Sequence, residues 1–238
     1  LIGFTTQMEK GYSNAIESNL YPNNLVPTLN AASGITMGTS GINAWSLISY
    51  LARFNYNYEN KYYLTTSIRT DGSSRFGAQK RYAVFPSVAL AWRISNENFL
   101  KDVPSISMLK LRTSYGESGN NDIGNYQQYA TIAYQKYPFG ESAVGGFAPN
   151  QIANPILTWE KQIQINLGID VGLFKDRVVL AVDHFRSTNS NLLLNVNIPG
   201  ITGFTTALQN IGKVKNKGWE FVLISKNLTG RFEWETSL

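Results

Sequence analysis

The stretch Gln162-Ile-Gln-Ile-Asn-Leu-Gly-Ile-Asp-Val-Gly-Leu173 alternates polar and apolar residues without a break. Because the side chains of a β-strand point to opposite faces in turn, this period of two predicts one long strand with two unlike faces. The polar face carries amides, glycines and Asp170. The apolar face consists of Ile163, Ile165, Leu167, Ile169, Val171 and Leu173.

The same alternation recurs in eight further segments, which predicts an all-β chain of about nine strands. Their apolar positions are Ile2, Phe4 and Met8, then alternate residues within 50–56, 64–68, 88–92, 109–115, 178–182 and 219–223, and finally Phe232 and Trp234. Charged residues fall on the other face, among them Arg53, Arg69 and Arg112. We therefore expect the apolar face to meet lipid, and these arginines, with Asp170, to line an enclosed lumen.

The connections between the predicted strands alternate between short and long. Short links are expected at residues 59–61, 175–177 and 227–230 and over about 95–107, and long links near 10–44, 72–83, 118–159 and 189–213. In a sheet whose strands run up and down, all short links reach one end and all long links the other, as in outer-membrane β-barrels. Aromatic residues also gather beside the short links, which is typical of the membrane–water boundary.

Composition narrows the classes of protein that fit. Charged residues make up 16% of the 238 residues, against roughly 25% in soluble domains, and no apolar run is long enough for a transmembrane helix. The Lys and Arg residues that give the net charge of +5 are scattered, apart from Lys213, Lys215 and Lys217, so nucleic acid is not an expected partner. Alternation alone also fits a soluble sheet, so a soluble or cell-surface all-β carbohydrate-binding or adhesion module stays an alternative.

Residues that could perform chemistry are few. The chain has no cysteine and one histidine, His184, so neither a metal site nor any other cofactor is expected. Asp183 precedes His184 but points to the opposite face of the strand, so it does not orient the imidazole for acyl transfer, and no enzyme is predicted. We expect His184 at a strand end near the outer interface. Thr70-Asp71-Gly72 and Asn216-Lys217-Gly218 carry turn chemistry, which predicts a hairpin tip and a return from a loop.

Several strings go beyond periodicity. In chain order they are Thr70-Asp-Gly-Ser-Ser-Arg-Phe-Gly77, Phe85-Pro-Ser-Val-Ala-Leu-Ala-Trp-Arg-Ile94, Asn98-Phe-Leu-Lys101, Leu109-Lys-Leu-Arg-Thr-Ser-Tyr-Gly-Glu-Ser-Gly-Asn120, Leu157-Thr-Trp-Glu-Lys161, Gly203-Phe204, Leu208-Gln-Asn-Ile-Gly212 and Val214-Lys-Asn-Lys-Gly-Trp-Glu220. This succession covers nearly the whole chain and resembles the SusC/RagA family of TonB-dependent outer-membrane transporters of Bacteroidetes.

The resemblance implies an incomplete antiparallel up-and-down transmembrane β-barrel, about nine strands of a larger plugged barrel of roughly 22. We expect residues 1–238 to form one partial barrel domain, with the plug and the N-terminal extension absent. The implied function is nutrient import, of an oligosaccharide or a peptide, across the cell outer membrane. The implied partners are outer-membrane lipid, a SusD-like surface lipoprotein that acts as a lid, and the TonB–ExbB–ExbD complex, reached through the missing N-terminal part.

Aromatic residues in the long stretch 118–159 are the candidates for contact with substrate or with the lid. They are Tyr126, Tyr129, Tyr134, Tyr137, Phe139 and Phe147. Aromatic faces suit stacking on sugar rings or apolar side chains, and they equally suit packing of the loop against its neighbours or against the lid. We favour packing, because a large loop needs a small core of its own.

Overall fold

The chain folds around one antiparallel sheet of nine strands in a computed structural model that describes residues 1–26 and 28–238. The strands are β1 (Ile2–Asn19), β2 (Gly34–Tyr58), β3 (Tyr62–Ser73), β4 (Tyr82–Arg93), β5 (Ile106–Asn120), β8 (Glu160–Leu173), β9 (Val178–Ser190), β12 (Lys213–Thr229) and β13 (Glu233–Ser237). Each pairs with the next in this order, so the sheet runs up and down. The prediction of about nine strands is confirmed.

Four further strands form two hairpins outside the main sheet. They are β6 (Thr131–Phe139) with β7 (Ser142–Gln151), and β10 (Leu193–Asn197) with β11 (Thr206–Asn210). Three 3₁₀ turns lie in links: η1 (Leu29–Ala31), η2 (Ile94–Asn96) and η3 (Gly200–Thr202). No helix among the described residues is long and apolar enough to span a membrane.

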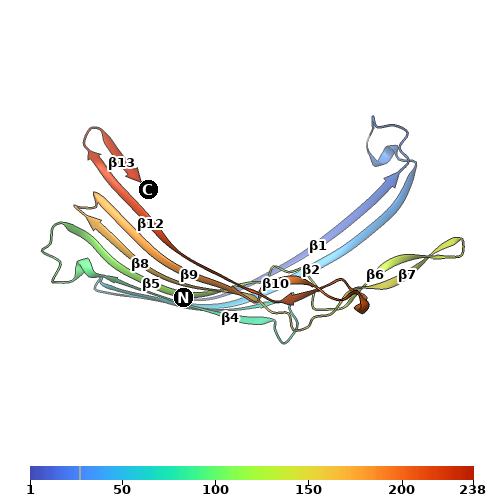
Figure 1. Ribbon diagram of the computed structural model, residues 1–238, viewed down its shortest axis with the longest axis horizontal. Helices are drawn as coiled ribbons and strands as arrows, with labels where there is room; N and C mark the ends of the chain where they lie inside the picture. The colour runs from blue at the N-terminus through green and yellow to red at the C-terminus, as the bar shows by residue number, and fades with distance from the viewer. Residues whose placement is uncertain (27) are drawn as a thin grey trace.

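The sheet curves into an open trough, with β1 at one rim and β13 at the other (Figure 1). These two edge strands are not paired with each other, so the described part of the chain does not close into a barrel. The β6–β7 hairpin projects well beyond the sheet, at the end opposite the short turns (Figure 1).

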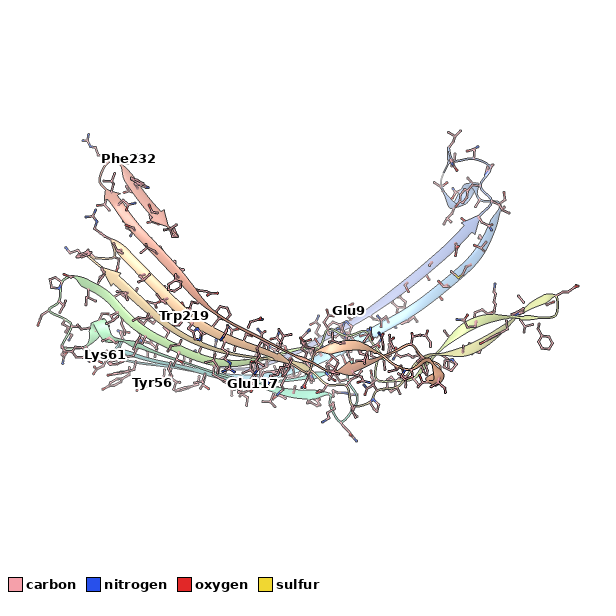
Figure 2. The ribbon with its side chains drawn as sticks, viewed as in Figure 1. Glu9, Tyr56, Lys61, Glu117, Trp219 and Phe232 are labelled. Carbon is pink, nitrogen blue, oxygen red and sulfur yellow. The ribbon has the colours of Figure 1, made fainter. Side chains whose placement is uncertain are left out.

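The two faces of the trough differ as the alternation predicts. The register puts Leu111, Ile169, Val182 and Phe221 side by side in one cross-strand row. This apolar face is the convex one, on which Tyr56 lies, whereas Glu9 points to the concave side (Figure 2). No layer of described residues covers this convex face, since Ile165 is 48% and Leu167 58% exposed. On β8, ten steps from Ile163 to Leu173, at about 3.3 Å each and a tilt of about 40°, give an apolar row about 25 Å tall, which includes the boundary level beside the long links as well as the lipid-facing belt.

The short links have the backbone that tight hairpins require. Glu59 and Asn60 both have positive φ, at 52° and 53°, and the Lys61 N–H donates to the Tyr58 carbonyl at 2.9 Å. Two consecutive left-handed residues define the turn type that matches strand twist. Phe174, Lys175 and Asp176 are also left-handed and close the β8–β9 link. The short links predicted at 59–61, 95–107 and 175–177 are confirmed.

Where strands meet long links, the sequence-based boundaries are wrong in two places. Residues 10–19 and 34–44, expected in a long link, extend β1 and β2, so only residues 20–33 connect them. Residues 34–44 are rich in Gly, Ser and Thr and do not alternate regularly, so their intrinsic propensity for a β-strand is weak. Pairing with residues 10–19 of β1 overrides it. Residues 118–159 and 189–213 hold the two extra hairpins rather than plain loops.

Three expected turns are also strand. Thr70-Asp71-Gly72 lies within β3, and Asn216-Lys217-Gly218 lies within β12. The link predicted at 227–230 begins at Gly230, because Asn227 forms a bulge between Lys226 and Leu228 inside β12. At these positions the glycines allow a neighbouring strand to approach closely, and Asn227 forms a bulge, so none of them marks a turn.

Candidate transport surface

A network of one arginine and two aspartates crosses the middle of the concave face. Arg112 on β5 donates through Nε and Nη2 to both carboxylate oxygens of Asp170 on β8, at 2.8 and 2.7 Å. Its Nη2 also donates to Asp183 on β9, at 2.9 Å. The side chain passes over Gly168, the residue between Arg112 and Asp183 in the cross-strand row. A Cβ at position 168 would lie 2.3 Å from an Asp183 oxygen, so this path requires glycine.

A second polar cluster lies closer to the long links. The Nε of Arg69 donates to both carboxylate oxygens of Asp71, at 2.7 and 2.8 Å, and its Nη2 donates to the Ser49 hydroxyl at 2.9 Å. Ser49 and Asp71 are buried. Asp71, expected in a turn, therefore belongs to the sheet, where it anchors Arg69. Arg53, the remaining predicted lumen residue, shares this concave face through its pairing with Ser67.

Amides and carboxylates line a hollow of about 310 Å³ on the concave side of β8, β9 and β12. Its lining includes Gln162, Gln164, Asn166, Asn216 and Glu220. Such groups offer both hydrogen-bond donors and acceptors, which suits the hydroxyls of a sugar or the amides of a peptide.

A buried core ties the long links together at one end of the sheet. This link core consists of Phe76, Phe85, Ile123, Leu157 and Trp159, none more than 7% exposed. The Trp159 ring packs against Phe76 and Phe85, with centroids 5.3 and 5.6 Å apart, and its Nε1–H donates to the Arg81 carbonyl at 2.9 Å. The alternation in the sequence does not predict this core. Leu157 and Trp159 continue the series of odd-numbered apolar residues that forms the convex face of β8, but both side chains are buried in the core instead.

The β10–β11 hairpin is attached to this core by side-chain amides. Asn210 donates to the Thr158 carbonyl at 2.7 Å and accepts from the Thr158 N–H at 2.8 Å. Asn154 donates to the Leu208 carbonyl at 2.8 Å. Three long links, 74–81, 121–159 and 191–212, are thereby held as one unit.

The six predicted loop aromatics lie outside this core. Tyr134, Tyr137, Phe139 and Phe147 belong to the β6–β7 hairpin, and Tyr126 and Tyr129 precede it. All six are exposed, with Phe139 at 81% and Phe147 at 70%. Tyr134 contacts Phe147 edge to face, and the Tyr126 hydroxyl accepts the Ala44 N–H at 3.2 Å. The buried core of the long links is formed by other residues, while these aromatics make local contacts within the hairpin and with β2.

His184 lies in the middle of β9, not at a strand end as expected. Its ring packs on Trp219 with centroids 4.6 Å apart, whereas Asp183 faces the other way and binds Arg112. The described residues contain no group of three side chains able to hold a metal ion.

At the end with the short links, aromatic rings stack along the convex face. Tyr58, Tyr62 and Trp92 follow one another at centroid distances of 6.4 and 6.3 Å. Glu97, in the link after η2, accepts hydrogen bonds from the Tyr62 hydroxyl at 2.7 Å and from Trp92 Nε1 at 3.1 Å. These two donors, with Lys61 at 3.3 Å, lower the pKa of Glu97.

A two-faced, up-and-down sheet with tight turns at one end and structured long links at the other defines a segment of an outer-membrane β-barrel. The family model described as "TonB dependent receptor-like, beta-barrel" matches residues 2–238, and the chain belongs to this family. It is therefore a protein of the cell outer membrane, from a family of transporters and receptors rather than enzymes.

Relatives support the SusC/RagA resemblance. The chain is 43% identical over its whole length to TonB-dependent receptor P39 of Formosa agariphila, and 39% identical over 81% of its length to TonB-dependent receptor SusC of Bacteroides thetaiotaomicron. A solved structure of the RagAB peptide transporter matches 97% of the chain with a TM-score of 0.85 and 30% identity. The chain spans 23% of P39, 20% of SusC and 26% of the RagAB chain.

Proposed function

We propose that this chain is part of a SusC-like, TonB-dependent transporter that imports an oligosaccharide or a peptide across the outer membrane. The observation that carries the proposal is the polar concave face, with its ion-pair networks and amide-lined hollow, on a sheet of this family. A large polar nutrient requires a wet passage lined by hydrogen-bonding groups. The names of two relatives, SusC and the RagAB peptide transporter, are consistent with such cargo.

The proposal assigns opposite surroundings to the two faces. Arg53, Arg69, Arg112 and Asp170 line the lumen, and the row from Ile163 to Leu173 faces lipid. The exposed convex face supports this assignment, because an uncovered apolar sheet is stable in lipid and prone to aggregate in water. The soluble binding-module alternative has no such explanation for this surface.

The same arrangement supports the proposed partners. The exposed aromatics of the β6–β7 hairpin project beyond the sheet, where a SusD-like surface lipoprotein would cover the barrel. Large exposed aromatics are typical of protein interfaces, so we assign Phe139 and Phe147 to the lid contact. The TonB–ExbB–ExbD complex would supply energy through other parts of the transporter.

The test uses the complete gene product expressed together with the proposed SusD-like lipoprotein. Deleting the gene should abolish uptake of labelled oligosaccharides or of labelled peptides, and plasmid-borne wild type should restore it. The F139A/F147A double variant should lose co-purification of the lipoprotein. Ile201→Ala, which truncates an apolar residue at η3 that is 97% exposed, is the control and should keep co-purification. Undiminished uptake of both nutrient classes in the deletion strain would refute the import proposal.

A further inference from the structure

Five basic side chains gather on the convex face where β8, β9 and β12 approach the long links. Cross-strand pairing places Arg186 beside Ile165 and Lys217, and Ser190 beside Lys161 and Lys213. Lys215 follows the same face of β12 through its pairing with Thr188. Because alternate residues share a face, this basic patch continues the apolar surface rather than the concave one. We define the basic patch as Lys161, Arg186, Lys213, Lys215 and Lys217.

The basic patch carries more positive charge than the described residues compensate. Lys161 forms an ion pair with Glu117 at 3.4 Å, and Glu117 also accepts a hydrogen bond from Tyr115. The other four cations form no ion pair with any described residue, and all four are exposed. Five cations less one carboxylate leave a local charge of +4. Lysines at alternate positions of one strand stand about 7 Å apart and repel each other, so a bound anion would stabilise this arrangement.

The order of side chains along β12 gives the depth of the basic patch. On the convex face the strand presents Lys213, Lys215 and Lys217, then Trp219, then Phe221 and Leu223. Tryptophan marks the membrane–water boundary, and the apolar residues beyond it lie at hydrocarbon depth. His184, packed on Trp219, belongs to the same level. Glu117, next to Lys161, lies on the convex side (Figure 2). The cations therefore stand at the depth of the lipid headgroups, at the end with the long links, which faces the cell exterior.

We propose that the basic patch binds the phosphate groups of lipid A, the phosphorylated glycolipid of the outer leaflet. This rests on the assignment of the convex face to lipid made above, but not on the nature of the cargo. Arginine donates two parallel hydrogen bonds to a phosphate, and lysines supply point charges around it. A lid protein sits over the mouth and a nutrient enters the lumen, so neither reaches this side of the strands. The headgroup of a lipid reaches the basic patch, because the acyl chains of the same lipid lie against the apolar rows of the convex face.

The test measures binding of diphosphoryl lipid A to the complete gene product in detergent micelles. The patch variant R186Q/K215Q/K217Q removes three positive charges from the basic patch. The matched control K80Q/K101Q/K136Q removes three from exposed lysines in other parts of the chain. Each lost cation should weaken binding roughly fivefold, so the patch variant should bind about a hundredfold more weakly and the control like wild type. Equal weakening in both variants, or in neither, would overturn the proposal.

Three further arms use the wild type, so they decide the question even where the patch variant does not fold. Dephosphorylated lipid A should bind much more weakly than the diphosphoryl form, and added salt should weaken the latter. Millimolar inorganic phosphate should not displace the lipid. Equal binding of both lipids, or displacement by inorganic phosphate, would show a general anion site and contradict the proposal. Lipid binding that persists in a protein without uptake would refute import while leaving this inference intact.

Discussion

Removing Arg112 should destabilise the barrel, because it takes away the shared countercharge of Asp170 and Asp183. Arg112→Met deletes three charge-assisted hydrogen bonds, whose individual net contribution is about 1.5–3 kcal/mol when well shielded. The arginine side chain is 35% exposed, so solvent screening reduces this contribution. We therefore expect a total loss of about 2 kcal/mol in the free energy of unfolding.

The assay is a double-mutant cycle on the complete transporter refolded into lipid vesicles, with urea unfolding followed by tryptophan fluorescence. Asp170→Asn alone and combined with Arg112→Met should give a coupling energy of about 1 kcal/mol. Arg53→Met serves as the control, because it removes a concave-face arginine to which the described residues give no ion pair, and should change stability by less than about 0.5 kcal/mol. A coupling energy indistinguishable from zero would refute the stabilising role of the network.

Three other changes test separate parts of the structure. Leu157→Ala should cost about 2–5 kcal/mol by opening a cavity in the link core, and limited proteolysis should then cut the long links faster than in wild type. Leu167→Arg should lower the free energy of unfolding by about 2–4 kcal/mol, because it places a charge at mid-depth in lipid, whereas Asn166→Arg on the concave face should be tolerated. The measurement is gel mobility without heating, which reports the folded barrel. Equal loss of this mobility in both variants would contradict the assignment of faces. Glu97 stabilises the fold above its usual pKa of about 4.3 and loses this effect as pH falls through its lowered value, so Trp92 fluorescence should change below about pH 4.3. Glu97→Gln should abolish that change, and a transition that persists in the variant would exclude Glu97 as its source.

The faces of the strands are predictable from sequence because alternation is local. Ile163 and Asp170 each point to the side that the period of two assigns. The β8–β9 register also follows from the tight turn after Leu173, which fixes the pairing of Gly168 with Asp183. The register of β5 against β8 does not, because 39 residues separate Asn120 from Glu160. The Arg112 network depends on both registers, so the sequence places its members on one face without pairing them.

The link core escapes prediction for a different reason. Phe76, Ile123 and Leu157 come from three separate links, and none belongs to a periodic segment. Their contacts depend on where long links meet in space, which no local pattern records. The exposed aromatics of β6–β7 look equally suited to a core in sequence. Only the hairpin's projection beyond the sheet distinguishes them.

The β6–β7 hairpin has its own hydrogen-bonded ladder, and the main sheet passes directly from β5 to β8. The hairpin can consequently be lengthened, shortened or replaced by that of a relative without changing the strand pairing of the nine-stranded sheet. The lid contact proposed above can thus change in length and sequence while the pairing of the main sheet stays as it is.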